Sequence, residues 1–279
     1  MMNSKRNAIL KFASCAALLF IAYLPTLRWM VDRWMAAESY YGHGFLIPII
    51  SLFIVWQRRE ALKKITISGT LAGLWIVALG LLIHIVSAAL KVYFVSGFSF
   101  ILVLYGLILF FFGKEMVRSL TFPVFFLLAM VPLPLVLIGN LTVKLKLIAA
   151  QASTFILNRI GFPSIQDGSI IRMPNSHIEV AAPCSGLRSL ISLLTLGLLF
   201  AYSMKISYVR KSILFLSSVP IALAANVTRI VMVAVVNDLY GGKVAMGLFH
   251  DFTGFLVFAF AFVGLFAVSR VLETKNEVR

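Results

Sequence analysis

The chain has 279 residues, of which 61% are hydrophobic and only 13% are charged, and 24 of them are phenylalanine. This composition is too apolar for a soluble globular domain and predicts a protein that crosses a membrane several times. The formal net charge is +15, but the basic residues stand mostly in short clusters between apolar runs, where they orient membrane helices. We therefore expect no nucleic-acid partner.

Apolar runs bounded by polar clusters recur along the chain, each of roughly 17 to 25 residues, the length that a helix needs to cross about 30 Å of hydrocarbon. They predict an all-α polytopic integral membrane protein with about eight transmembrane helices, in a single domain over residues 1–279. The expected spans are residues 12–27, 41–57, 69–90, 92–113, 119–138, 187–204, 212–236 and 251–270. The second run is the weakest, and we expect it to be short, tilted or re-entrant. The first run is followed by no Ala-x-Ala-like cleavage site, so we expect a retained helix and not a signal peptide.

Lysine and arginine assign the orientation, because loops rich in these residues stay in the cytoplasm. With the N-terminus inside, every inner loop is basic, and the inner side carries nearly twice as many of these residues as the outer side. We therefore expect both termini to be cytoplasmic.

The segment of residues 139–186 is the only sizeable stretch expected outside the membrane. Residues 141–160 carry basic and amide side chains among apolar ones at helical spacing, which predicts a helix lying in the interface. Short apolar runs at residues 170–173 and 178–180 flank Pro174-Asn175-Ser176, a pattern typical of a small β-hairpin. The second strand of this hairpin leads the chain toward Cys184.

Three reactive side chains are expected at the outer end of the helix bundle. Cys184 directly precedes the sixth span, and His250 directly precedes the eighth. Arg229 lies seven residues before Val236, the outer end of the seventh span, so it is about 10 Å below that surface. A charge at this depth normally faces a polar cavity or a partner.

Together these residues predict a covalent acyl-transfer site. Cys184 would attack as the thiolate, His250 would take up and return the proton, and Arg229 would stabilise the substrate carbonyl or the oxyanion. Other interpretations stay open. Cys184 as an inert small hydrophobe and Ser185 as the nucleophile are two of them.

Arg229 and His250 also have structural alternatives. Arg229 could snorkel toward the surface or pair with Asp238 or Asp251. His250 could be an ordinary interfacial residue whose neighbour Asp251 caps the eighth helix.

Further residues are weaker candidates for substrate binding. Asn226 shares a helix face with Arg229, being three residues away, and His43 lies at the outer end of the second span. Arg188, together with Arg172, could receive an acidic motif at the outer face.

Metal and disulfide chemistry are not expected. His84 and His177, with the other scattered histidines and the two cysteines, give no ligand spacing of the usual kind, so we expect neither a metal nor another cofactor. Cys15 lies near the inner end of the first span, most of a bilayer away from Cys184, so we expect two free thiols.

Four strings resemble those of the exosortase and archaeosortase family, and the resemblance covers roughly residues 35–270. They are Pro183-Cys184-Ser185-Gly186-Leu187-Arg188-Ser189, Asn226-Val227-Thr228-Arg229, His250-Asp251 and Tyr41-Gly42-His43-Gly44-Phe45. The resemblance implies a polytopic cysteine protease or transpeptidase with Cys184, Arg229 and His250 as its active-site residues.

The resemblance also implies a substrate and a location. The substrate would be an exported protein with a C-terminal sorting helix, preceded by a Pro-Glu-Pro-like (PEP-CTERM-like) motif and followed by basic residues. The enzyme would lie in the inner membrane of a Gram-negative bacterium, among membrane lipids, with its site facing the periplasm. Nothing in the sequence decides between water and an acceptor amine as the second nucleophile.

Two other classes stay open beside this one. A polytopic transporter would also place an arginine at depth, but it predicts discontinuous helices and internal repeats, and no repeat is visible. A non-catalytic assembly subunit for envelope or exopolysaccharide export is the other.

Overall fold

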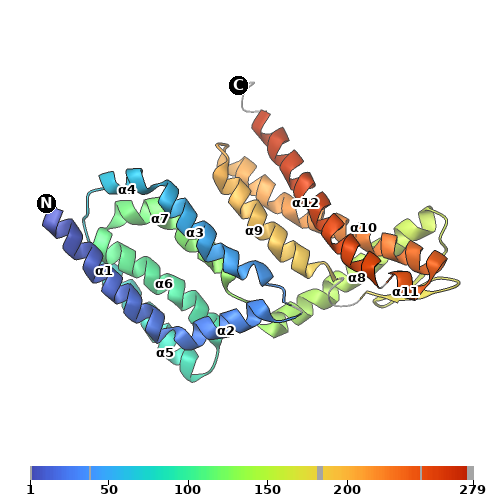
Figure 1. Ribbon diagram of the computed structural model, residues 1–279, viewed down its shortest axis with the longest axis horizontal. Coiled ribbons are helices and arrows are strands. Elements are labelled where there is room, and N and C mark those ends of the chain that lie inside the picture. Colours follow the sequence, from blue (N-terminus) through green and yellow to red (C-terminus); the bar gives the residue numbers. More distant parts are fainter. Residues whose placement is uncertain (1, 38, 181–184, 246, 275–279) are drawn as a thin grey trace. The chain divides into compact units, whose positions relative to one another are not determined.

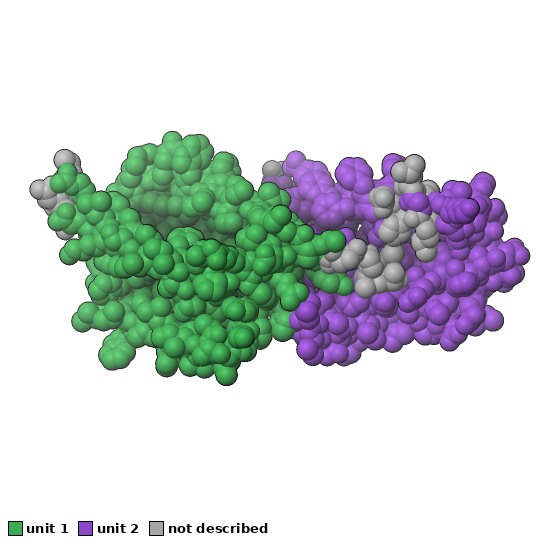
Figure 2. Space-filling model, turned by 60° about the horizontal axis from the view of Figure 1, so that its bottom comes forward, with its two compact units in different colours: residues 1–134 green, residues 135–279 purple. Residues whose placement is uncertain are grey.

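The computed structural model describes residues 2–37, 39–180, 185–245 and 247–274, and within these the side chains of residues 2–5, 248–251 and 274 are outside the description. The chain divides into two compact units, Met1–Pro134 and Leu135–Arg279, which Figure 2 colours green and purple. Each unit is built almost entirely from helices (Figure 1). The protein is therefore an all-α polytopic membrane protein, as its composition predicts.

Unit 1 is a bundle of apolar helices. Its elements are α1 (Met2–Ala22), α2 (Leu24–Met35), η1 (Gly42–Phe45), α3 (Leu46–Gln57), α4 (Arg59–Lys64), α5 (Ala72–Ala89), α6 (Tyr93–Phe112), α7 (Lys114–Phe126) and η2 (Leu127–Met130). Small residues let α5 and α6 pack closely, as is usual between membrane helices. A Cβ on Gly73 would meet the backbone nitrogen of Phe110, and one on Gly80 would lie 2.5 Å from Cγ2 of Val103.

The first expected span, residues 12–27, is not one straight helix. α1 ends at Ala22, α2 begins at Leu24, and the two are bent by 64° relative to each other. Pro25 stands in the first turn of α2, where its missing N–H leaves no hydrogen bond unmade, whereas inside a continuous helix its ring would clash with the preceding turn. The expectation of a single span is therefore corrected to a bent pair.

A group of polar side chains lies beside this bend. The Tyr23 hydroxyl and Ser99 Oγ are 2.9 Å apart, and Thr26 Oγ1 and Ser96 Oγ are 2.6 Å apart. His84 Nδ1 lies 2.8 Å from Ser96 Oγ, and its ring stacks on the Tyr23 ring. These contacts satisfy polar groups that would be costly to leave unpaired in an apolar environment.

The fifth expected span, residues 119–138, is wrong at its C-terminal end. The helical segments α7 and η2 end at Met130, and residues 131–134, which include Pro132 and Pro134, are not helical. Proline disfavours helical backbone at the residue before it, so two prolines so close together end the helix. Trp34 Nε1 donates to the Met130 carbonyl oxygen at 2.9 Å and satisfies one of the acceptors at this end.

Unit 2 holds the remaining helices and a small sheet. Its elements are α8 (Leu135–Arg159), β1 (Ile165–Asp167), β2 (Ile170–Arg172), β3 (His177–Glu179), α9 (Leu187–Ser203), α10 (Tyr208–Tyr240), α11 (Gly242–Ala245) and α12 (Leu248–Thr274). The expected hairpin is present as β2 and β3, and β1 adds a third antiparallel strand in the order β1-β2-β3. The expected helix at residues 141–160 is also present, but it starts earlier, at Leu135, and its place in the interface stays a prediction.

The sheet is fixed to the helices by a buried apolar cluster. Ile171 and Ile178 are partners across β2 and β3, and both are buried. They belong to one cluster with Leu157 of α8 and Val233 of α10. The sheet is thereby held against two helices of its own unit.

Length and composition identify the candidate membrane spans among the described residues. Five helices qualify, namely α5, α6, α8, α10 and the apolar part of α12, and the bent pair of α1 and α2 makes a sixth if it counts as one span. The segments at residues 42–57 and 187–203 are apolar but shorter. A total of eight spans and the cytoplasmic termini stay predictions.

Candidate active site

One face of α10 carries two of the polar residues singled out in the sequence. Asn226 and Arg229 are three positions apart and so lie on the same side of this helix. Asn226 is only 2% exposed, and Arg229 is partly buried. α10 packs against α8, α9 and α12 within unit 2 (Figure 1).

The turn that precedes α9 is in close contact with Asn226. Gly186, the residue before α9, has a φ of +78°, which L side chains rarely adopt. A Cβ built there would lie 2.9 Å from both Cγ and Nδ2 of Asn226. Only glycine therefore fits this turn, and the turn fixes the chain two residues after Cys184. Cys184 itself lies outside the described residues.

Arg229 makes the corresponding contact with α12. A Cβ built on Gly254 would lie 3.3 Å from Nη2 and 3.6 Å from Cζ of Arg229, so the guanidinium packs against this glycine. Gly254 follows His250 by four residues in α12, so the two positions share a helix face. The side chain of His250 lies outside the described residues.

The hydroxyl of Ser185, the alternative nucleophile, makes a hydrogen bond to the neighbouring backbone. Ser185 is fully buried, and its Oγ accepts a hydrogen bond from the Leu187 backbone N–H at 3.3 Å. Such a bond satisfies a donor at the start of α9. The nucleophilic interpretation of Ser185 stays a prediction, with this structural role beside it.

The sheet is fastened to the C-terminal part of α10 by two side-chain contacts. Asn237 Nδ2 donates to the His177 carbonyl oxygen at 3.3 Å, and Ser176 Oγ donates to Asp238 Oδ1 at 3.0 Å. Asp238 lies nine residues beyond Arg229, roughly 13 Å along the helix axis. The proposed pairing of Arg229 with Asp238 is therefore incompatible with this geometry.

The other candidates are more dispersed. Arg188 is exposed in the first turn of α9, next to the Gly186 turn. Arg172 pairs with Asp167, with Nη2 and Oδ2 2.8 Å apart on an exposed surface. His43 belongs to η1 of unit 1, where its ring stacks on that of Tyr41. Its participation in the site stays a prediction.

Sequence reasoning missed Gly254 and Asn237 as parts of this region. The spacing of four residues between His250 and Gly254 is a signal that was available, because it places a small residue on the face of the candidate base. Asn237 carried no comparable signal, since its partner is a backbone carbonyl 60 residues away. No group of three potential metal-ligating side chains occurs in the part of the chain that the structure describes. Cys15 is a free thiol in α1.

These features define a multi-pass helical membrane protein with a buried polar face at the meeting of α9, α10 and α12. A model of the transmembrane exosortase family (Exosortase_EpsH) matches residues 34–267, most of the chain. The chain therefore belongs to the transmembrane exosortase family. The family consists of cysteine-type transpeptidases and proteases, which supports a role of this kind in processing exported proteins with sorting signals. No curated protein and no solved structure matches the chain.

Proposed function

We propose that the protein is a membrane-embedded cysteine protease or transpeptidase that cleaves a C-terminal sorting signal through an acyl-enzyme on Cys184. Arg229 stabilises the oxyanion, and His250 is the general acid and base. The observation that carries the proposal is the packing of Gly186 and Gly254 against Asn226 and Arg229. Gly186 lies two residues after Cys184, and Gly254 lies one helical turn after His250 in α12.

The first half of the reaction forms a thioester. His250 takes the proton from the thiol, and Sγ of Cys184 attacks the carbonyl carbon of the scissile peptide bond. The developing oxyanion is stabilised by the guanidinium of Arg229. When the C–N bond breaks, His250 returns the proton to the leaving amine, which departs with the C-terminal helix of the substrate.

The second half releases the product. Water or an acceptor amine attacks the thioester carbonyl, His250 accepts its proton, and the thiolate of Cys184 leaves. Water gives a free carboxylate and makes the enzyme a protease, whereas an amine gives a new amide and makes it a transpeptidase. The proposed substrate is an exported protein with a PEP-CTERM-like tail, cleaved at the periplasmic face of a bacterial inner membrane.

Substitution of Cys184 tests the mechanism. In cells that express a tailed exported protein, Cys184→Ala should abolish C-terminal processing at an unchanged membrane level of the enzyme. Arg229→Gln and His250→Gln should lower it by about 10²-fold or more, the usual range for an oxyanion donor or a general base. Processing is read from the mass of the substrate's C-terminus, with hydroxylamine added to trap the thioester as a hydroxamate.

Two matched controls separate the alternatives. Cys15→Ala removes the other thiol of the chain and should leave processing intact. Ser185→Ala distinguishes the two candidate nucleophiles, since it should leave hydroxamate formation in place. Undiminished processing by Cys184→Ala, or loss of the hydroxamate only in Ser185→Ala, would refute the proposed nucleophile.

A further inference from the structure

Unit 1 contains a large apolar hollow that the proposed reaction does not use. Its volume is about 800 Å³, and its walls come from α1, α3, α6 and α7, with Ala16, Val55 and Leu104 among the lining residues. In Figure 1, α3 and α7 lie on one side of unit 1 and α1 and α6 on the other, and residues of all four helices line the hollow. We call it the unit 1 hollow. An apolar hollow offers water no hydrogen-bond partners, so its walls suit an apolar ligand.

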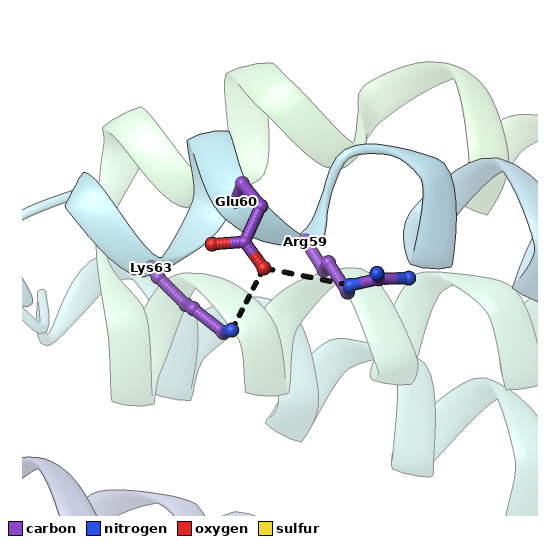
Figure 3. A network of polar contacts seen from close by, with 3 residues as sticks. All are labelled: Arg59, Glu60 and Lys63. Carbon is purple, nitrogen blue, oxygen red and sulfur yellow. Dashed lines mark hydrogen bonds and ion pairs between the residues drawn. The ribbon is translucent and has the colours of Figure 1, made fainter.

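One end of the hollow carries basic side chains. Arg59 and Lys63 of α4 line it together with Trp56, over whose ring the Arg59 guanidinium carbon lies at 4.4 Å. Glu60 Oε1 contacts both cations, at 3.5 Å from Arg59 Nε and 2.8 Å from Lys63 Nζ (Figure 3). Two cations share one carboxylate, so this rim keeps a net positive charge. Both basic side chains are about half exposed or more, and so remain accessible to a ligand.

The width of the occupant bears on what the hollow can hold. Flexible acyl chains are narrower than a helix, which is about 10 Å wide with its side chains, and they fit an apolar hollow of about 800 Å³. A transmembrane helix is the competing occupant, and the experiment below separates the two.

The charge of the rim selects the kind of lipid. Lysine and arginine at a membrane surface attract anionic headgroups and bind phosphate oxygens. Their apolar stems lie along the hollow while the charged ends reach the headgroup region. A zwitterionic headgroup offers the same phosphate but adds a cation that the rim repels.

We propose that the unit 1 hollow binds one anionic phospholipid. An acyl chain of this lipid lies beside Ala16 and Leu104, and its phosphate is bound by Arg59 and Lys63. This site is independent of the proposed catalytic residues. Unit 1 would thus bind a lipid that takes no part in the proposed reaction.

Native mass spectrometry of the full-length protein tests the site. Delipidated protein in mild non-ionic detergent is titrated with phosphatidylglycerol or with phosphatidylcholine of the same acyl chains. We expect one tightly bound phosphatidylglycerol and weaker binding of phosphatidylcholine. Lys63→Gln should weaken phosphatidylglycerol binding about fivefold, since each basic residue near an anionic lipid contributes a factor of that order.

The chain offers a matched control for each part of the ligand. Lys64→Gln changes the same charge on the next residue of α4, which does not line the hollow, and should leave the affinity unchanged. Ala16→Phe places a large side chain in the hollow beside the proposed acyl chain and should weaken binding of both lipids. Ala17→Phe, on the exposed side of α1, should not.

Several results would overturn the proposal. Equal affinity for the two lipids, or equal effects of Lys63→Gln and Lys64→Gln, would show attraction to the surface charge alone. Unchanged binding in Ala16→Phe would place the lipid elsewhere. A helical occupant is tested with Leu104→Cys in a background that lacks both native thiols, Cys15→Ser and Cys184→Ser. Protection of that cysteine from a maleimide by a synthetic transmembrane peptide, and not by phosphatidylglycerol, would also refute the lipid site.

Discussion

Replacing Gly186 with alanine should destabilise the protein by an amount that follows from two separate costs. A residue with a side chain in the left-handed region costs about 1 to 2 kcal/mol, and Gly186 has a φ of +78°. The added Cβ would also lie 2.9 Å from two atoms of Asn226, a residue that is 2% exposed and has little room to move. Overpacking of this kind costs about 1 to 3 kcal/mol.

The combined cost of about 2 to 5 kcal/mol corresponds to a fall in Tm of roughly 5 to 15 °C for a chain of this size. The assay is thermal unfolding of the purified protein in detergent, alongside substrate processing in cells. Gly139→Ala is the matched control, because Gly139 lies in α8 with nothing within 4 Å of its added Cβ. That variant should match or slightly exceed the parent in Tm, since alanine is the better helix former.

A double-mutant cycle separates the two costs. Asn226→Ala removes the Cγ and Nδ2 atoms that the new Cβ would meet, so Gly186→Ala should be less destabilising in that background, while the backbone cost remains. A Gly186→Ala variant with the Tm of the parent would refute the packing described for this turn. Additive effects of the two substitutions would refute the steric part alone.

Two other substitutions probe the contacts of Arg229 and the bend in the first helix pair. Gly254→Ala would place a Cβ 3.3 Å from Nη2 of Arg229, and the resulting shift of a few tenths of an ångström should lower processing by roughly threefold to tenfold at unchanged abundance. Gly264→Ala in the same helix meets only ordinary contacts and should leave processing unaltered. Tyr23→Phe removes the hydroxyl that lies 2.9 Å from Ser99 Oγ, which should destabilise unit 1 by about 1 to 2 kcal/mol, read as a lower Tm with processing intact.

Either variant could also behave like the parent. Full processing by Gly254→Ala would mean that the position of the guanidinium beside α12 does not matter for the reaction. An unchanged Tm in Tyr23→Phe would mean that the buried hydroxyl contributes no net stability.

The long apolar helices were predictable from the sequence because their composition alone decides their structure. Residues 69–90 and 92–113 were expected as spans, and α5 and α6 lie within these limits. The bend at Tyr23 was not predicted, because the polar contacts beside it join residues about 70 positions apart. Pro25 was a local signal for the bend, but the continuous apolar run around it outweighed that signal in the prediction.

The boundary between the two units shows a second limit of sequence reasoning. The basic residues Lys144 and Lys146 favoured a separate interfacial helix beginning near Leu141. The structure instead continues one helix from Leu135 to Arg159, since Pro134 ends the preceding segment and lies just before the first turn, where proline costs no hydrogen bond. An apolar run does not by itself show where one helix stops and the next begins.

For the candidate site, the sequence predicted the shared face of Asn226 and Arg229 but not what covers it. Helical spacing is a local property and is read directly from the chain. The contacts of Gly186 and Gly254 with that face depend on how α9 and α12 pack against α10, which periodicity does not determine. Glycine at these two positions is understood only once the partner side chains are known.

α10 is longer than the hydrocarbon core of a bilayer is thick, and the sheet is attached near its C-terminal end. Its 33 residues give a rod of about 50 Å, against a hydrocarbon thickness of about 30 Å. Tilt alone would have to exceed 50° to hide the whole rod, beyond the usual limit of about 40°. Part of α10 must therefore stand clear of the lipid tails. Asn237 and Asp238, which fasten the sheet, lie within the last turn of this rod. The strands are thus fastened to one end of a helix that is longer than the hydrocarbon core is thick.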